Sequence, residues 1–361
     1  MFQITLLPVS YGDSLWVEYG DPQHPRRVLI DGGPIGCYDP LEERINALPD
    51  GEKCLELTVI THVDEDHIAG IIRLIAEKNR AITFKDIWFN GWKHLTPEPE
   101  ILGAMQGEFL SALIHHKLTD RKWNAAKPFQ GKAIEVPDGN TLPVSTFADG
   151  LKLTLLSPTQ AKLDKLRKDW KRTVPHDFTP GDLEEALKRL LEQKRLTPNG
   201  ILGGGRRMDE AEPAAKLTAN NESSIAFLAE FEGKSCLFLG DASPRVVEAS
   251  VRLLLKERNR DKLAVDVVKV SHHGSHNNTT KSLLKIIDCK KFCVSTNGKK
   301  FDHPHPVAIE KIIDTAGPDV ELYFNYRSDT TQAWSNKTLQ KSKHYTAHYP
   351  AAGQEGITVT L

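Results

Sequence analysis

Residues Leu55–Lys78 read LELTVITHVDEDHIAGIIRLIAEK, and this stretch decides what is expected of the rest of the chain. The apolar, β-branched run that ends at Ile60 is typical of a short buried strand. Apolar residues resume at Ile68 with helical spacing. Between the two runs stand five ionisable side chains: His62, Asp64, Glu65, Asp66 and His67. Burying such groups is costly unless something compensates them, and a metal ion is the usual compensation.

The same arrangement, a strand followed at once by a potential ligand, recurs along the chain. Asp31 follows VLI, Asp241 follows CLFLG, and His272 and His273 follow VVKVS. Loops at one edge of an open sheet can be aimed without disturbing the core, so functional groups gather there. A lone aspartate after a strand is usually a turn or a helix cap. Several such clusters in one chain indicate a common site.

These residues resemble the motifs of the metallo-β-lactamase superfamily, which carries H-x-[HD]-x-D-H after a strand, then a later aspartate and a final histidine. The metal ligands that the resemblance implies are His62, Asp64, Asp66, His67, Asp241 and either His272 or His273. It also implies that Asp31 supports the motif loop from behind the ligands. The fold implied is a four-layer αββα sandwich of the α/β (α+β) class, with residues 1–361 forming one domain.

Within that superfamily the chain is similar to the soluble domain of the ComEC/Rec2 competence proteins. The shared features are YGDS, HVDEDH, NESS, LGD, VSHHGS and NGKKFDHPHP. This likeness implies nuclease or phosphodiesterase chemistry. It also places further side chains behind the ligands, where they support the site without binding the metal: Asp13, Asn221, Ser223 and His305.

Two positions depart from the better-known β-lactamase pattern. Asp64 replaces the second histidine of the motif, and Asn221 lies where a third-motif histidine is expected, 20 residues before Asp241 (241 − 221 = 20). The ligand set is therefore richer in oxygen, which favours Mn²⁺ relative to Zn²⁺. We predict one or two divalent ions per chain, Zn or Mn, and Asp241 bridges them if two are bound.

The function expected is that of a metal-dependent hydrolase in which a metal-activated water attacks a phosphodiester, a nucleic acid or a nucleotide. Asp64 and Asp66 are the candidates to orient that water. His303, in FDHPHP, is the candidate to protonate the leaving group or to hold a phosphate oxygen. Hydrolysis of a lactone, an amide or a thioester is the alternative within the same chemistry.

Two other classes of function stay open. YGDSL and DHPHP also match the signatures of GDSL-type serine esterases, with Ser14, Asp302 and His305 as the triad. Ser14 is followed by the alternating run LWVEYG, which is typical of a strand, whereas such a nucleophile stands where a strand turns into a helix. The other possibility is a binding module whose site has no catalytic role.

Residues 161–219 differ from the rest of the chain in their residue pattern. AKLDKLRKDWKRT and DLEEALKRLLEQKRL are predicted to form charged amphipathic helices, followed by a glycine-rich connector. We predict an insertion that serves as a lid or as a surface for a protein partner. The first of these helices carries six Lys and Arg residues in thirteen positions, which would suit a polyanion or simply a solvated face.

Composition adds limits on location and partners. The net charge of −1 over 361 residues gives no global attraction to nucleic acid or to anionic lipid. No apolar run approaches the roughly 20 residues of a membrane span, and the first residues lack the basic region of a signal peptide. The five cysteines are scattered. A cytoplasmic, reducing setting without a membrane partner is therefore expected.

Overall fold

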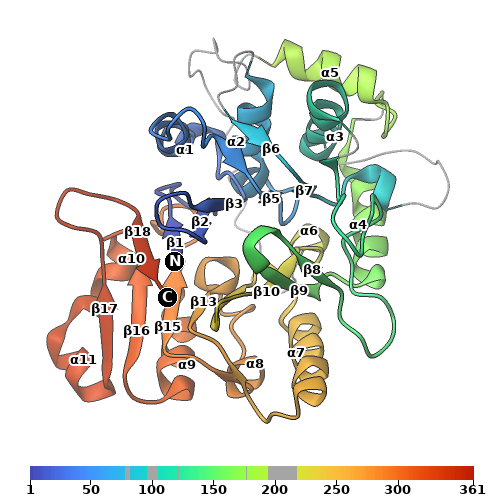
Figure 1. Ribbon diagram of the computed structural model, residues 1–361. Coiled ribbons are helices and arrows are strands. Elements are labelled where there is room, and N and C mark those ends of the chain that lie inside the picture. The colour runs from blue at the N-terminus through green and yellow to red at the C-terminus, as the bar shows by residue number, and fades with distance from the viewer. Residues whose placement is uncertain (78–81, 96–104, 120–121, 176, 194–217) are drawn as a thin grey trace.

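The computed structural model describes residues 1–77, 82–95, 105–119, 122–175, 177–193 and 218–361 (Figure 1). Its strands pair into two large sheets. The first has the order β18-β1-β2-β3-β5-β7, in which β3, β5 and β7 are parallel. Its strands are β1 (Phe2–Leu6), β2 (Leu15–Tyr19), β3 (Arg26–Ile30), β5 (Leu57–Val59), β7 (Ile87–Trp88) and β18 (Ile357–Thr360).

The second sheet has the order β17-β16-β15-β13-β11-β10-β9-β8. The strands from β11 to β17 in this order are parallel, and the others are antiparallel. Its strands are β8 (Val144–Thr146), β9 (Lys152–Ser157), β10 (Ala226–Phe231), β11 (Lys234–Phe238), β13 (Val267–Lys269), β15 (Lys291–Val294), β16 (Val320–Phe324) and β17 (Tyr345–His348). Two short pairs complete the strands: β4 (Cys54–Leu55) with β6 (Thr83–Phe84), and β12 (Leu263–Ala264) with β14 (Ile287–Asp288).

The alternation of side chains along the strands explains how the sheets stack. In β2, Leu15 and Val17 belong to a core that also contains Leu155 and Phe227 of the second sheet. Trp16, which points to the opposite face, belongs to a separate core. Because successive residues of a strand face opposite sides, the first sheet contacts the second sheet with one face and helices with the other.

Helices cover the outer face of each sheet. Ile68 and Ile72 of α2 pack in the same core as Trp16, whereas Val251 of α7 and Ile312 of α9 pack against the second sheet. The layers therefore run helix, sheet, sheet, helix, which confirms the predicted αββα sandwich (Figure 1). The helices are α1 (Asp39–Asn46), α2 (Glu65–Ala76), α3 (Met105–Leu113), α4 (Gln160–Thr173), α5 (Leu183–Glu192), α6 (Ala219–Glu222), α7 (Pro244–Arg258), α8 (Lys281–Lys285), α9 (Pro306–Ala316), α10 (Asp329–Gln332) and α11 (Lys337–Lys343).

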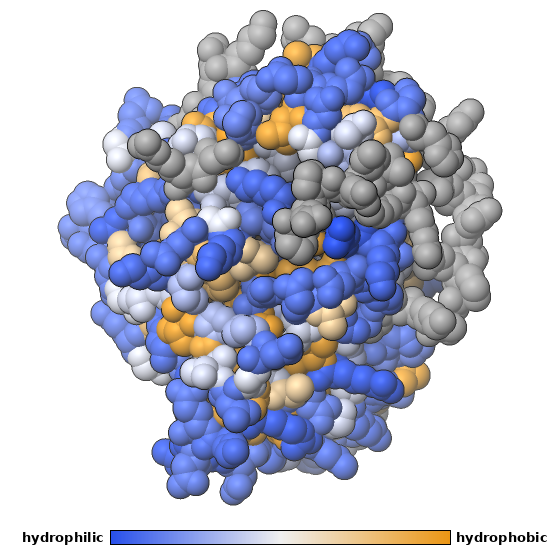
Figure 2. All heavy atoms as spheres, turned by 90° about the vertical axis from the view of Figure 1, so that its right-hand side faces the viewer, coloured by the Kyte–Doolittle hydropathy of each residue, from blue (hydrophilic) through white to orange (hydrophobic). Residues whose placement is uncertain are grey.

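The two helices expected within residues 161–219 are present as α4 and α5. Their apolar faces, with Leu166, Trp170 and Leu190, join the core on the helix side of the first sheet. The glycine-rich connector lies outside the described residues, so its role as a lid or docking surface stays a prediction. Figure 2 shows the side of the molecule that carries these helices, where hydrophilic side chains dominate and apolar patches are small. Among the helices that the structure describes, none is long and apolar enough to span a membrane.

Candidate metal centre

The loops that follow β5, β11 and β13 bring histidine and aspartate side chains together. Nε2 of His62 and Nε2 of His67 lie 3.8 Å and 3.7 Å from Oδ2 of Asp241. All three side chains are buried, and their ligand atoms lie within 4.8 Å of one another. Asp64 faces the same group, because its Oδ2 atom lies 3.4 Å from Nε2 of His62.

A second group adjoins the first and shares His67 with it. Oδ2 of Asp66 lies 3.9 Å from Nε2 of His67 and 3.9 Å from Nε2 of His273. Nε2 of His273 lies 4.0 Å from Oδ1 of Asp241. Asp241 therefore presents one carboxylate oxygen to each group. This arrangement can hold one or two cations.

The unpaired atoms of this cluster fit a divalent cation. Four buried atoms have no hydrogen-bond partner among the described residues: Nε2 of His62, His67 and His273, and Oδ1 of Asp241. Buried polar atoms without a partner are rare in folded proteins and call for an explanation. Imidazole nitrogens and carboxylate oxygens are common ligands of Zn²⁺ and other divalent metals. A bound cation would satisfy these atoms together.

The opposite nitrogen of each imidazole is held by the protein. Nδ1 of His67 lies 2.8 Å from Oδ2 of Asp31, and Nδ1 of His273 lies 2.9 Å from the carbonyl oxygen of Ser295. These acceptors place the proton on Nδ1, which leaves the lone pair of Nε2 facing the cluster. Nδ1 of His62 contacts the hydroxyls of Thr61 (3.0 Å) and Ser224 (3.1 Å).

Asp31 also supports the motif loop directly. It accepts hydrogen bonds from the Thr61 amide (2.8 Å) and from the Thr61 hydroxyl (2.7 Å). Asp64 occupies the N-cap position of α2 but makes no capping hydrogen bond. Its Oδ1 atom instead accepts a hydrogen bond of 2.6 Å from Asn220. The carboxylate is thus turned away from the helix and toward His62.

The pKa values reflect these close contacts. Burial raises the pKa of Asp241, but the neighbouring imidazoles, above all those of His272 and His67, bring it well below its usual value. Burial lowers the pKa of His67, but Asp241 and Asp31 bring it well above its usual value. Carboxylates and imidazoles thus stabilise each other's charged forms, and a bound cation would take the place of the imidazole protons.

The two histidines of SHHG differ in position. His273 is buried and belongs to the group with Asp66 and His67. His272 is partly exposed; its Nε2 atom lies 3.5 Å from Oδ2 of Asp241, and its Nδ1 atom lies 3.0 Å from Oδ1 of Asn278. The geometry therefore favours His273 as the final ligand, and His272 borders the first group beside Asn221. Their roles as ligands stay predictions.

The residues predicted to lie behind the ligands occupy different places. Asn221 lies at the site, where its Nδ2 atom donates to Oδ2 of Asp241 at 3.2 Å. Oδ1 of Asp13 lies 3.5 Å from Nδ1 of His273. Ser223 instead donates to the carbonyl oxygen of Asn220, at 2.6 Å. His305 lies farther out, where its Nδ1 atom is 3.2 Å from Nδ1 of His276.

His303 lies at the border of the cluster. Its ring centroid is 5.3 Å from that of His272 and 6.3 Å from that of His273. Burial, together with the neighbouring imidazoles, lowers the pKa of His303 to about 2. A neutral imidazole at pH 7 is suited to donating one hydrogen bond to a substrate oxygen, and less suited to protonating a leaving group.

Several supporting residues were not among the predicted site residues. Thr61 and Ser224 hold His62, Asn220 holds Asp64, and Asn278 holds both His272 and the carbonyl oxygen of Asp241. Lys269 donates a hydrogen bond to Asp13. Two of them left a signal in the sequence: Lys269 interrupts the apolar run VVKV, and Ser224 is the last residue of the shared motif NESS.

The serine-esterase alternative has no geometric support. The Ser14 side chain is completely buried and its hydroxyl has no partner among the described residues. Ser14 leads directly into β2, not into a helix. Nδ1 of His305 contacts His276, and Asp302 is exposed. A nucleophile must be reachable by substrate and hydrogen-bonded to its base, and Ser14 is neither.

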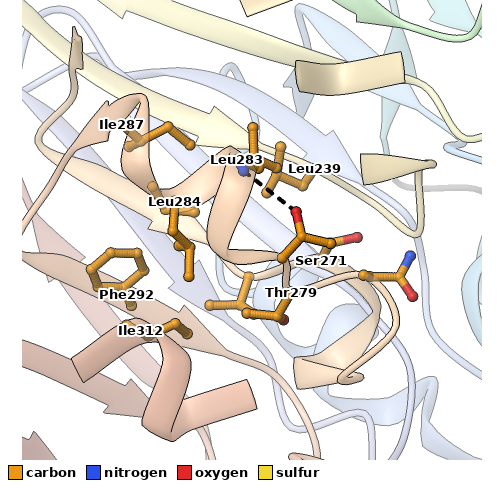
Figure 3. Close-up of a pocket in the computed structure, with 12 residues that line it drawn as sticks. Leu239, Ser271, Thr279, Leu283, Leu284, Ile287, Phe292 and Ile312 are labelled. Carbon is orange, nitrogen blue, oxygen red and sulfur yellow. Dashed lines mark hydrogen bonds between the residues drawn. The ribbon is translucent and has the colours of Figure 1, made fainter. Parts of the chain in front are cut away.

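An apolar cavity lies behind the SHHG turn, between α8 and the second sheet (Figure 3). Leu283, Ile287, Phe292 and Ile312 line it, with the hydroxyl-bearing Ser271 at one side. Its volume of about 20 Å³ would hold about one water molecule. It is therefore a packing defect of the core and not a substrate site.

The chain is similar to a few known proteins at low sequence identity. No family model matches the chain. It is 22% identical, over 85% of its own length, to ComE operon protein 3 of Bacillus subtilis (strain 168), and the match spans only 30% of that protein. The fold is similar to that of the metallo-β-lactamase fold protein YhfI from Bacillus subtilis, with 11% identity, a TM-score of 0.43 and 99% of each chain covered.

A second solved structure is similar at the same level. Zn²⁺-bound PqqB from Methylobacterium extorquens has 12% identity and a TM-score of 0.43, with 100% of each chain covered. The chain is similar to metallo-β-lactamase fold proteins. These likenesses are weak, and the metal centre rests on its own distances and unpaired atoms. A histidine and aspartate cluster of this kind fits a metal-dependent hydrolase.

Proposed function

We propose that this protein is a metal-dependent hydrolase that cleaves phosphodiesters. The observation that carries the proposal is the pair of adjoining ligand groups, which meet at Asp241 and His67. The first group would hold one ion through His62, Asp64 and Asp241, and the second would hold another through Asp66, His67 and His273. Bound divalent ions supply Lewis acidity and lower the pKa of water, which suits hydrolysis of a phosphodiester near neutral pH.

The chain's own side chains would divide the remaining tasks. Asp64, whose side chain is 32% exposed, is more exposed to solvent than Asp66, which is 13% exposed. It is placed to accept a proton from an attacking water. His303, neutral and adjacent to His272, is placed to donate a hydrogen bond to a phosphate oxygen. Asp31 and Asn220 hold the ligands in position and do not contact substrate.

The choice of a phosphodiester is supported by two observations. ComE operon protein 3 is similar over most of this chain, and the ligand set is rich in carboxylates. The basic helix α4 lends less support than its sequence suggested. Lys162 and Lys165 are both paired with Glu222 of α6, so these two cations anchor the helix next to the site and are not free for a polyanion.

A substrate panel tests the proposal. Purified protein loaded with Mn²⁺ or Zn²⁺ is assayed on bis-p-nitrophenyl phosphate, single-stranded DNA, RNA, p-nitrophenyl acetate and a lactone. We expect phosphodiester hydrolysis that EDTA abolishes and that Asp241→Asn reduces by at least about 100-fold, whereas the exposed control Asp314→Asn retains it. Hydrolysis of the lactone or ester alone would show that the substrate is not a phosphodiester. Unchanged activity in Asp241→Asn would show that this cluster is not the active site.

A further inference from the structure

The turn formed by residues 297–303 lies beside the metal centre and carries an exposed aromatic ring. Phe301 is 49% exposed, and it is the only aromatic side chain among the strongly exposed large apolar residues that the structure describes. Its ring centroid lies 5.9 Å from that of His303, which in turn contacts the rings of His272 and His273. One ring therefore separates this exposed side chain from the ligand cluster.

Lys300 places a positive charge next to Phe301. Its Nζ atom lies 4.9 Å from the centroid of the Phe301 ring and 4.4 Å from the centroid of the Tyr11 ring. Within the described part of the chain no carboxylate lies within ion-pair distance of Lys300, and the residue is exposed. The aromatic rings orient the ammonium group without neutralising it. Its charge is therefore available to an anion.

The surrounding contacts show that this turn is held in place. The amide of Asn297 donates to the carbonyl oxygen of Ser10 at 2.7 Å, and the hydroxyl of Ser295 donates to the carbonyl oxygen of Gly12 at 2.9 Å. These bonds tie the turn to the loop that carries Tyr11. On the other side, the hydroxyl of Thr330 donates to the carbonyl oxygen of His303 at 2.8 Å.

Gly298 allows the turn its close packing. It has a φ of +75°, and a Cβ at this position would collide with the side chain of Thr330. An exposed ring and a cation that pairs with no carboxylate of the described residues thus stand together at the edge of the site.

We propose that Lys300 and Phe301 form a nucleotide-binding subsite, in which Phe301 stacks against a base and Lys300 binds the phosphate next to it. The proposal rests on the phosphodiesterase function proposed above and names single-stranded nucleic acid as its substrate class. Every base presents a π-face, so such stacking favours nucleotides over simple dialkyl phosphates without selecting a base sequence. In a duplex, stacking between neighbouring base pairs covers the π-face of each base, so the subsite favours single strands.

Binding to a labelled single-stranded hexanucleotide, measured by fluorescence anisotropy with EDTA present, tests the stacking contact without cleavage. Phe301→Ala should weaken binding by about tenfold, and Phe301→Trp should retain it. Val307→Ala is the matched control, because Val307 is 52% exposed, and it should bind as the unaltered protein does. An analogue of the hexanucleotide without bases should bind Phe301→Ala and the unaltered protein equally.

Salt dependence tests the phosphate contact. Lys300→Gln should weaken binding and reduce the slope of log affinity against log salt by about 0.7, the value for one phosphate contact on a single strand. Lys299→Gln removes the adjacent exposed charge and should change the slope less. Equal slopes for the two lysine variants would overturn the assignment of Lys300.

The outcomes separate this subsite from the proposed activity. If the unaltered protein does not bind the hexanucleotide, or if Phe301→Ala binds it equally well, the subsite is wrong even when bis-p-nitrophenyl phosphate is cleaved. If the metal-loaded protein cleaves no phosphodiester while the Phe301→Ala and Lys300→Gln effects on binding are present, the subsite stands as a nucleotide-binding surface and the proposed hydrolysis fails.

Discussion

Nζ of Lys269 lies 2.6 Å from Oδ2 of Asp13, and the two side chains are 1% and 2% exposed. Oδ1 of the same aspartate lies 3.5 Å from Nδ1 of His273, one of the candidate ligands. This ion pair joins the loop before β2 to the last residue of β13, so it ties the first sheet to the second directly beneath the metal centre.

Breaking this pair should be costly because either partner alone would be left as a buried charge. We expect Lys269→Met or Asp13→Asn to lower the free energy of unfolding by roughly 3–5 kcal/mol. The double variant should lose less than the sum of the two. Urea unfolding of the metal-free protein measures these losses. Lys343 forms an exposed ion pair with Asp314, so the control Lys343→Met should lower the free energy of unfolding by at most about 1 kcal/mol. Strictly additive losses would show that the pair does not act as a unit.

Asp31 should act on metal affinity through His67, because its carboxylate accepts the hydrogen bond of Nδ1 and so orients Nε2. Asp31→Asn should weaken metal binding by about 10- to 100-fold. Asp241→Asn, which removes a proposed ligand, should weaken it more. Competition with a coloured chelator measures both, with Asp314→Asn as the exposed control. An affinity unchanged in Asp31→Asn would mean that His67 does not bind the metal.

Metal affinity should rise with pH. The pKa of His67 lies well above its usual value in the metal-free protein, so the imidazole carries a second proton, on Nε2, at neutral pH. This proton must leave when a cation binds there. Proton release should be seen in unbuffered titrations with Mn²⁺ or Zn²⁺. The affinity should level off once the pH exceeds the raised pKa. An affinity that is flat between pH 6 and pH 8 would contradict this assignment.

The stability of the metal-free protein should follow the opposite trend. Because the folded pKa of His67 is raised, its contribution is fully present below the unfolded pKa of about 6.5 and is lost as pH rises through the folded value. The shift in melting temperature on adding metal should therefore grow with pH. Differential scanning fluorimetry with and without EDTA measures this. A shift that shrinks as pH rises would be inconsistent with displacement of an imidazole proton.

Glu108 provides a pH test on a carboxyl group that is not among the candidate ligands. Burial raises its pKa to about 7, although it accepts hydrogen bonds from Trp170 of α4 and from the amide of Gly181. A raised carboxyl pKa contributes stability below the unfolded value, near 4.5, that is lost as pH rises through about 7. Glu108→Gln should remove this loss and flatten the dependence of unfolding free energy on pH over that range. A similar pH dependence in Glu108→Gln and the unaltered protein would assign the loss to other groups.

The motif loop shows how far local sequence patterns reach. The apolar run before His62 and the helical spacing after Ile68 predicted β5 and α2, because the two periodicities differ over short distances. The side chains between them were therefore expected at the end of a strand. Which oxygen or nitrogen each presents depends on contacts with residues far along the chain, such as Asn220 with Asp64.

Ser223 and His305 show the limit of motif matching. Both stand inside shared motifs, yet the hydroxyl that contacts His62 belongs to Ser224, and His305 contacts His276 instead of the ligands. Neighbouring residues in a turn point in different directions, so a shift of one position changes which side chain reaches the site. Sequence spacing alone does not determine that direction.

The amino-acid sequence by itself determined the strand that ends before His62, the helix that contains Ile68 and the set of ionisable residues that follow the strands, because apolar periodicity and strand-ending turns are local properties. The αββα layers were expected from the resemblance to a known superfamily and not from these local patterns. The tertiary structure alone decided that His273 lies in the buried ligand group, that Lys269 pairs with Asp13, and that Lys162 and Lys165 are occupied by Glu222. Each of these depends on two segments that meet only when the sheets pack, and the charges are stabilised only by the partner that packing brings to them.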